Sequence, residues 1–322
     1  MPRIVTLTMN PAIDVSTSTV CVEPERKLRC STGRRDPGGG GINVARVARR
    51  LGAEVTTVYP AGGFVGQMLQ QLVEQEGLTS VVIPVLGETR EDFTVLDEGA
   101  GEQYRFVLPG AHLHGVEWMN CLKVFASLGV KPEVVCASGS LPPGVPDDFY
   151  ARVAEIVGSW GAKFILDTSG AALRLALEEH VYLIKPNLRE LAELTDAAVD
   201  DEASQIAACR DVLGRRRVEI IALTLGAEGA LLVTRNRVWR ARPLKLLTVS
   251  TVGTGDSFLG GMAWGLASGL SLEESFRHGV AAGSATLLAV GTALASAEDV
   301  HHLLSHVMIE ELSDHAAARA PA

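Results

Sequence analysis

The chain has 322 residues, of which 47% are hydrophobic and 21% charged, and its formal net charge is −9. This is a globular composition without the roughly 20 consecutive apolar residues of a membrane span, and the acidic balance argues against a nucleic-acid surface. Five cysteines without a Cys-x-x-Cys pair indicate neither a disulfide framework nor a zinc site.

The first residues indicate a strand and not a targeting segment. Residues 2–7 run Pro-Arg-Ile-Val-Thr-Leu, without the charged, apolar and small-residue zones of a signal peptide. We therefore expect a soluble, cytoplasmic protein that binds neither nucleic acid nor membrane.

A run of four glycines, Gly38 to Gly41, stands directly before a segment patterned as a buried helix that ends near Leu51. Glycine lets a ligand come close to the backbone, and Asn43 in the first turn would offer its amide to sugar hydroxyls. A flexible linker is the alternative, but a linker does not normally lead into a helix with apolar residues spaced for burial. We therefore expect a binding element here.

Two segments, about 16–35 and 90–108, carry alternating β-type sequence without a helix between the strands. Residues 93–97 and 103–108 flank a Gly-Ala-Gly turn and predict a hairpin. Such strands do not join a parallel sheet simply, so we expect a small separate β layer that covers the site as a lid and pairs with another subunit. Four basic residues in the lid would meet an anionic substrate, although each alone is more typical of a solvated surface: Lys27, Arg29, Arg90 and Arg105.

Further along, short apolar runs alternate with amphipathic segments. The runs are 134–136, 164–167, 182–184 and 220–225, and the segments between them include 147–160 and 203–213. This pattern predicts an α/β fold with a mainly parallel sheet and crossover helices. Ligands bind at the carboxyl ends of such strands, so we expect the polar residues that follow the runs to meet at one rim: Asn10, Asp14, Ser138, Ser140, Asp167, Lys185, Asn187 and Thr224.

The segment Lys185 to Glu190 follows a strand and opens a helix. It places Asn187 and Glu190 three residues apart on one face, where they would hold magnesium through water. The same spacing is that of an N-cap asparagine with a glutamate three residues later, which would be structural. Residues 223–231 predict a strand, a glycine-bounded turn and a second strand, which would either line a nucleotide pocket or form a plain hairpin.

Residues 251–258, Thr-Val-Gly-Thr-Gly-Asp-Ser-Phe, precede an apolar helix expected over 258–267. Gly253 and Gly255 allow close approach of the backbone, and the first N–H groups of the helix would bind a phosphoryl group. Asp256 would then accept a proton from an attacking hydroxyl. A tight turn with an N-capping aspartate is the structural alternative.

Taken in order, four motifs resemble the PfkB family of carbohydrate kinases in the ribokinase superfamily. They are Asn10-Pro-Ala-Ile-Asp14, the glycine-rich element that ends at Asn43, Lys185-Pro-Asn-Leu-Arg-Glu190, and Gly253-Thr-Gly-Asp256. The likeness extends to about residue 308. It implies a ribokinase-like three-layer α/β/α fold with a β lid in one kinase domain over residues 1–312, followed by a frayed tail over 313–322.

Residues 27–30, 101–107 and 138–144 look most like the 6-phosphofructokinases of this family. The resemblance implies ATP-dependent phosphorylation of fructose 6-phosphate at its 1-hydroxyl, with Mg²⁺ as cofactor. 1-Phosphofructokinase and tagatose-6-phosphate kinase activity stay open, since both would use the same base. A non-catalytic sugar-phosphate sensor is an alternative of another class, which the retained Asp256 disfavours.

The resemblance also implies roles for particular residues. Asp256 would be the base, with Gly253, Thr254 and Gly255 around the transferred phosphate. The sugar phosphate would contact Asp14, Gly39, Asn43 and Ser138, with Lys27, Arg29, Arg90 and Arg105 at its phosphate, some of them from the partner in a homodimer clasped by the lid. ATP would lie near Lys185, Asn187, Thr224, Gly226, Gly229 and Thr251, Mg²⁺ near Asn187 and Glu190, and a monovalent cation such as K⁺ near Ser250 and Val252.

Three positions depart from the pattern of the family. Thr254 stands where relatives commonly have a smaller residue, and Thr224 stands where close relatives more often have Ser. Ala293 replaces a larger polar residue near the expected cation loop, which leaves potassium activation open. None of these changes removes a catalytic group.

Overall fold

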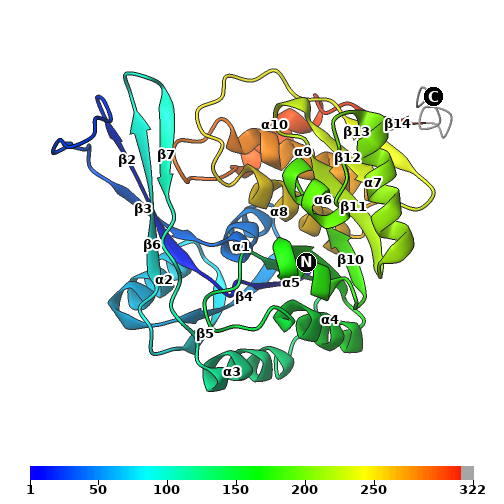
Figure 1. The fold of residues 1–322 in the computed structure, drawn as a ribbon, viewed down its shortest axis with the longest axis horizontal. Helices are drawn as coiled ribbons and strands as arrows, with labels where there is room; N and C mark the ends of the chain where they lie inside the picture. Colours follow the sequence, from blue (N-terminus) through cyan, green and yellow to red (C-terminus); the bar gives the residue numbers. More distant parts are fainter. Residues whose placement is uncertain (313–322) are drawn as a thin grey trace.

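The computed structural model describes residues 1–312, so the expected frayed tail lies outside the described residues. Two separate sheets organise this part of the chain (Figure 1). The large sheet has ten strands in the order β14-β13-β12-β11-β10-β9-β8-β1-β4-β5, and the small sheet has four in the order β3-β2-β6-β7. Over residues 1–312, no helix has both the length and the apolar character to cross a membrane.

Seven neighbouring strands of the large sheet, from β5 to β11 in the sheet order, run parallel. The other three, β12, β13 and β14, each pair antiparallel with the preceding strand. Crossover helices separate the parallel strands in sequence, whereas short turns connect β11, β12 and β13. The predicted α/β fold with a mainly parallel sheet is thus confirmed. The strands are β1 Arg3–Leu7, β4 Glu54–Ala61, β5 Thr79–Pro84, β8 Val134–Ser138, β9 Lys163–Asp167, β10 Val181–Ile184, β11 Val218–Thr224, β12 Ala230–Val233, β13 Val238–Ala241 and β14 Ile309–Leu312.

Helices cover both faces of the large sheet and complete three layers. Successive residues of a strand point to opposite faces, so Ile4 of β1 packs in one core and Val5 in the other. The first core contains α1 Gly40–Arg50, α2 Gly63–Gln75, α8 Thr254–Ala267, α9 Leu272–Thr286 and α10 Ala297–Leu304. The second contains α3 Gly115–Ala126, α4 Phe149–Trp160, α5 Gly170–Ala176, α6 Leu188–Thr195 and α7 Glu202–Arg215.

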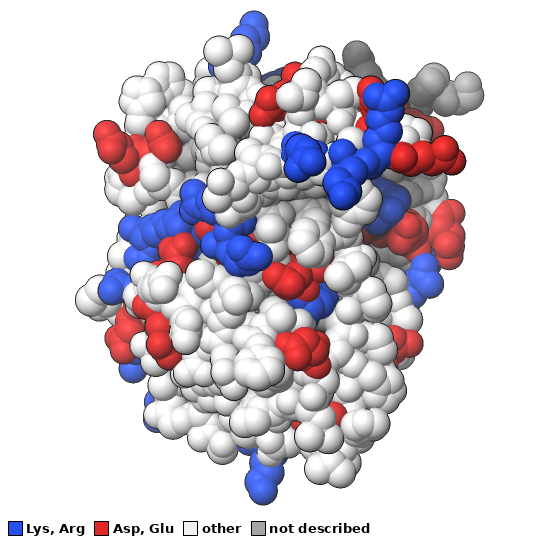
Figure 2. Space-filling model, turned by 90° about the vertical axis from the view of Figure 1, so that its left-hand side faces the viewer, with Lys and Arg blue, Asp and Glu red and all other residues white. Residues whose placement is uncertain are grey.

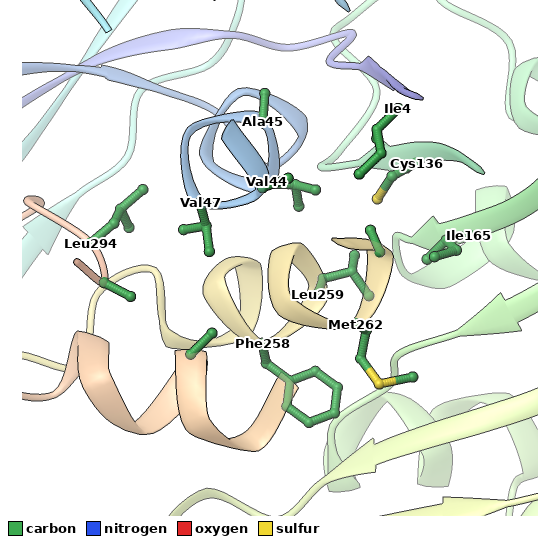
Figure 3. Close-up of a cluster of buried hydrophobic side chains, with 14 of the residues drawn as sticks. Ile4, Val44, Ala45, Val47, Cys136, Ile165, Phe258, Leu259, Met262 and Leu294 are labelled. Carbon is green, nitrogen blue, oxygen red and sulfur yellow. The ribbon is translucent and has the colours of Figure 1, made fainter. Parts of the chain in front are cut away.

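Helices α1 and α8 lie against each other on the first face of the sheet. Figure 3 shows Val44 and Val47 of α1 facing Leu259 of α8, with Ile4, Cys136 and Ile165 of the strands beside them. A Cβ on Gly260 would lie 2.8 Å from the Cβ of Val47, so a larger residue there would push the helices apart. This close packing places the N-terminal turns of α1 and α8 side by side.

The small sheet consists of β2 Ala12–Thr19, β3 Arg34–Gly38, β6 Arg90–Asp97 and β7 Glu102–Phe106, and it projects from the body of the molecule (Figure 1). The predicted hairpin is confirmed, since β6 and β7 pair antiparallel across the glycine turn. The sheet begins at Ala12, earlier than expected, and residues 20–33 form no strand. Pro24 lacks an N–H for pairing and Glu25 has a positive φ of 59°, so this stretch is a long loop.

Candidate active site

The glycine loop before α8 is built for an anion. The helix begins at Thr254 and not at 258 as expected, because Gly253 adopts the left-handed conformation with φ 76° and serves as the N-cap. A Cβ there would also lie 2.3 Å from Cδ2 of Leu294. No side chain caps this helix, and the N–H of Thr254 donates to the carbonyl of Thr251 at 3.5 Å, so the N–H groups of Gly255 and Asp256 are available to a ligand. Asp256 lies in that first turn and is not the N-cap, so the capping alternative is wrong.

The glycine-rich element brings α1 to the ends of two strands. The helix starts at Gly40, so two of the four glycines lie inside it and not before it. A Cβ on Gly40 would lie 2.2 Å from Oγ of Ser138, and one on Gly41 would lie 2.6 Å from the carbonyl of Leu7. Only glycine permits this approach. As a result, Nδ2 of Asn43 donates to Oδ2 of Asp256 at 2.9 Å.

Asp256 is surrounded by charged groups from several strands. Burial and the charge of Asp167 raise the pKa of Asp256 to about 6. The hydrogen bond from Asn43, Lys185 and Arg105 act in the opposite direction. The carboxyl group therefore titrates close to physiological pH, which suits a general base.

Asp14 faces the same space from the small sheet. Burial, followed by the charges of Asp92 and Asp256, raises the pKa of Asp14 to about 7, although Arg46 and Arg105 oppose the increase. Its carboxyl lies against Gly38, where a Cβ would come within 2.4 Å of Oδ2. Two carboxyl groups with raised pKa values thus meet at the junction of the two sheets, where a polyhydroxylated ligand could bridge them.

Asp167 is a site residue that the sequence analysis placed at the rim without giving it a role. Nζ of Lys185 lies 3.2 Å from its Oδ1, and Oγ of Ser138 donates to its Oδ2 at 3.3 Å. Burial by itself would lower the pKa of Lys185, but the neighbouring carboxylates outweigh this effect and raise the pKa of Lys185 above its ordinary value. The side chain of Asn10 also donates to Oγ of Ser140 at 3.1 Å. The backbones of Asn187 and Thr224 form an isolated parallel β-bridge. These contacts confirm that the polar residues after the strands meet at one rim.

A cavity of about 530 Å³, here called the large cavity, opens beside the glycine loop. Thr254 and Gly255 line it. So do five of the six residues expected near ATP: Asn187, Thr224, Gly226, Gly229 and Thr251. The sixth, Lys185, lies just beyond, since a Cβ on Gly255 would be 3.3 Å from its Nζ. Residues 223–231 form a hairpin that also lines the cavity, and nucleotide binding there stays a prediction.

Sequence reasoning missed the opposite wall of the large cavity. Part of this wall comes from an irregular segment after β13, namely Leu244, Lys245, Leu246 and Thr248. The rest comes from α9 and its C-cap, namely Val280, Gly283, Ser284 and the C-cap Leu287. The irregular segment has no motif, and α9 has an ordinary amphipathic sequence. Only its packing on α8 brings that face to the cavity.

Asn187 and Glu190 form a reciprocal capping box at the start of α6. Oδ1 of Asn187 accepts from the backbone N–H of Glu190, and Oε2 of Glu190 accepts from that of Asn187, both at 2.9 Å. Over residues 1–312, no group of three or more His, Cys, Asp or Glu side chains could hold a metal. This arrangement leaves the second carboxylate oxygen of Glu190 as an acceptor for the water shell of Mg²⁺, whose binding here stays a prediction.

The four basic residues of the lid do not share one environment. The guanidinium of Arg90 donates to the carbonyls of Leu108 at 2.8 Å and Asn10 at 3.2 Å, and it lies 3.4 Å from Asp92. Arg105 is exposed, but its charge lowers the pKa of both Asp14 and Asp256. Lys27 and Arg29 lie in the exposed loop beyond Thr19, about 16 Å along β2 from Asp14. Within one chain, the structure therefore brings Arg90 and Arg105 to the site and leaves Lys27 and Arg29 outside it.

The segment around Ser250 and Val252 packs on the loop after α9. Oγ of Ser250 donates to the carbonyl of Gly291 at 3.0 Å and accepts from the N–H of Val252 at 3.2 Å. The carbonyl of Leu287 also accepts from the N–H of Val249 at 2.7 Å, so backbone carbonyls, the ligand type that a monovalent cation requires, join the two segments. Gly39, the N-cap of α1, has φ 100° and lies at the other side of the site.

This geometry joins a cavity, an anion site and a raised-pKa carboxyl, as expected of an enzyme that transfers a phosphoryl group to a hydroxyl. Residues 4–299 match the model of the pfkB family carbohydrate kinases. The chain is 44% identical, over 93% of its length and 88% of the relative, to ATP-dependent 6-phosphofructokinase isozyme 2 of Mycobacterium tuberculosis. It is 31% identical to 1-phosphofructokinase of Bacillus subtilis, over 96% of this chain and all of the relative.

A crystal structure of phosphofructokinase-2 from Escherichia coli in complex with potassium superimposes with a TM-score of 0.90 at 37% identity, covering 95% of this chain and 99% of that one. The chain therefore belongs to the PfkB family of carbohydrate kinases. It is an ATP-dependent sugar kinase with the ribokinase-like α/β fold that the motifs implied.

Proposed function

We propose that the protein is an ATP-dependent 6-phosphofructokinase, which converts fructose 6-phosphate to fructose 1,6-bisphosphate. The observation that carries the proposal is that the large cavity reaches Gly255, directly before Asp256, whose carboxyl group faces that of Asp14. ATP in the cavity would direct its terminal phosphate to the first turn of α8. A sugar between Asp14 and Asn43 would present its hydroxyl to Asp256.

The chemistry of the chain's own residues follows from this arrangement. The carboxylate of Asp256 takes the proton of the sugar 1-hydroxyl as the hydroxyl oxygen attacks the terminal phosphorus of ATP. The bond from that phosphorus to the bridging oxygen breaks, and ADP leaves. The free N–H groups of the first turn of α8 stabilise the negative charge on the transferred group. Lys185, held by Asp167 at 3.2 Å, adds a fixed positive charge beside Gly255.

Mg²⁺ fits the site as an ion carried mainly by the phosphates of the nucleotide, with water between it and Glu190. It would neutralise phosphate charge when bound. A monovalent cation fits the carbonyl-rich segment around Ser250 and Val252, and the potassium complex of the Escherichia coli relative supports this assignment. Ala293 offers no side-chain ligand there, and its backbone carbonyl accepts a hydrogen bond from Arg50 at 2.8 Å.

The small sheet is the proposed dimer clasp. Both of its edge strands, β3 and β7, lack a neighbour among the described residues, and exposed apolar side chains line β6 and β7: Phe93, Tyr104, Phe106, Val107 and Leu108. Lys and Arg side chains gather in a band on this side of the molecule, with acidic ones among them (Figure 2). In such a homodimer, Lys27 and Arg29 would reach the sugar phosphate of the partner, which they do not reach in their own chain.

The proposal is tested by measuring ADP release with ATP and Mg²⁺. Fructose 6-phosphate, fructose 1-phosphate, tagatose 6-phosphate and unphosphorylated sugars are compared as acceptors. We expect kcat/KM to be highest for fructose 6-phosphate. A preference for fructose 1-phosphate, the reaction suggested by the Bacillus subtilis relative, would keep the mechanism and change the substrate. If none of the acceptors supports turnover, the enzyme assignment is overturned in favour of a sensor.

A further inference from the structure

Arg46 is buried beneath the active site and has no role in the mechanism above. It lies on α1, one turn after Asn43, and its side chain is 0% exposed. Burying a guanidinium group is costly unless its donors are satisfied, so this position must carry a function that an apolar residue would not supply. Its partners come from three directions: Asp36 on β3, Glu76 after α2, and the loop after α9.

One of these contacts leads directly to the proposed base. Nη1 of Arg46 donates to Oδ1 of Asn43 at 3.3 Å, and Nδ2 of the same amide donates to Oδ2 of Asp256 at 2.9 Å. An amide has one acceptor end and one donor end. Arg46 offers only donors and the Asp256 carboxylate offers only acceptors, so both are satisfied in a single orientation of Asn43.

The guanidinium itself is held rigidly. Nε donates to Oε1 of Glu76 at 2.9 Å, Nη2 lies 3.3 Å from Oδ1 of Asp36, and Nη1 also reaches the carbonyls of Pro37 and Thr292. Asp36 is fixed in turn by the Thr292 hydroxyl at 2.6 Å. This frame keeps the donor that faces Asn43 in place.

We propose that Arg46 is a positioning residue for catalysis, which fixes the Asn43 amide with its NH₂ group toward Asp256 and so keeps that carboxylate ready to accept the proton. The inference rests on the proposed function, in which Asp256 is the base. The hydrogen bond from Asn43 lowers the pKa of Asp256, so its loss would raise that pKa. Four other charged groups face Asp256, and the substitution of Arg46 leaves their side chains unaltered in chemistry: Asp14, Arg105, Asp167 and Lys185.

The test compares Arg46→Lys with Arg50→Lys. Lysine keeps the positive charge near Asp14 but lacks the planar fork that spans Asn43 and the carboxylates. Arg50 is the matched control, because it binds both oxygens of Glu76 at 3.0 Å and the carbonyls of Ala293 and Ala295 but does not contact Asn43. The readout is the pH profile of kcat/KM for the sugar phosphate, in which ionisations of the substrates are common to all variants.

We expect Arg46→Lys to move the acid limb of the profile up by about one pH unit, the size of losing one hydrogen bond to a carboxylate. Activity would fall about fivefold at pH 6 and recover above pH 8, and Arg50→Lys would keep the wild-type limb. An unmoved limb in Arg46→Lys, or an equal shift in both variants, would overturn the inference.

Asn43→Ala keeps the test decisive if Arg46→Lys does not fold. The same upward shift is expected from Asn43→Ala alone. Where Arg46→Lys does fold, it should add nothing to that shift in the double variant. An unmoved limb in Asn43→Ala, or a further full shift in the double variant, would contradict the route through the amide. If Asp256→Asn still turns over, the base assignment falls and this inference with it. If Asp256→Asn is inactive while Arg46→Lys keeps the wild-type profile, only the role of Arg46 is refuted.

Discussion

The two halves of the active site are built differently. The proposed nucleotide half is the large cavity of about 530 Å³ between the β11–β12 hairpin and α9. The first core packs behind it. The proposed sugar half lies under a four-stranded sheet whose edge strands have no further partner within residues 1–312. Arg105 on this sheet, and Lys27 and Arg29 in the loop after β2, are exposed. A cavity backed by a packed core needs no rearrangement to accept its ligand, whereas the sugar half needs closure or a second subunit to surround the phosphate.

Asp256 stands where the two halves meet, so its replacement should affect the chemical step and neither binding event. We expect Asp256→Asn to lower kcat by about 10²–10⁴-fold or more, the usual contribution of a positioned base. Steady-state kinetics with calorimetric binding of ATP and of sugar phosphate checks this. Near-normal turnover would remove the base from the mechanism.

A variant confined to the nucleotide half should change ATP binding alone. Ser284 lines the large cavity from α9, and Ser284→Phe would place a ring inside it. We expect the KM for ATP to rise about 10-fold or more while the KM for the sugar phosphate stays within about twofold. Ser284→Ala is the control and should behave as the wild type. A parallel rise in both KM values would show that the halves are not separable.

Variants on the sugar half should separate a ligand-binding arginine from a structural one. Arg105→Ala removes an exposed charge, so the KM for the sugar phosphate should rise about tenfold without loss of thermal stability. Arg90→Ala should raise the same KM and also lower Tm, because Arg90 holds two backbone carbonyls and Asp92. If the KM for ATP rises as much as that for the sugar in either variant, the arginine is not specific to the sugar half.

The smallest expected effect concerns the cost of the site to stability. The folded protein raises the pKa of Asp14 from 3.8 to about 7, so it binds more protons than the unfolded chain between about pH 4 and 7. The extra proton bound by folded Asp14 contributes to the free energy of unfolding at low pH, and this contribution is lost as pH rises from about 4 to 7. Asp14→Asn cannot ionise and should raise the free energy of unfolding by about 1–2 kcal/mol at pH 8.

Denaturant unfolding at pH 8 and pH 5 measures this effect. The gain should be smaller at pH 5, where Asp14 is mostly protonated in the folded state, and sugar phosphate binding should weaken in the same variant. A loss of stability at pH 8 would mean that the Asp14 carboxylate is better satisfied than its surroundings indicate.

The glycine motifs were the most informative part of the sequence, yet their boundaries were misplaced. Both α1 and α8 begin among the glycines, at Gly40 and Thr254, because close contacts with Ser138, Leu7 and Leu294 favour glycine over any helix propensity. Local propensity alone places such helices later, after the last glycine. The spacing of Asn187 and Glu190 indicated a capping box, but only the structure showed that each side chain accepts from the backbone N–H of the other residue.

The sequence by itself determined the layered α/β architecture, the small separate sheet and the class of reaction, because periodicity and strand-end motifs are local properties of the chain. Tertiary structure decided which residues meet. The contact of Asn43 with Asp256 spans 213 positions, that of Arg46 with Thr292 spans 246, and the wall that α9 gives to the large cavity carries no motif. Such contacts depend on the packing of α1 and α9 against α8, which is set by the shapes of many side chains at once.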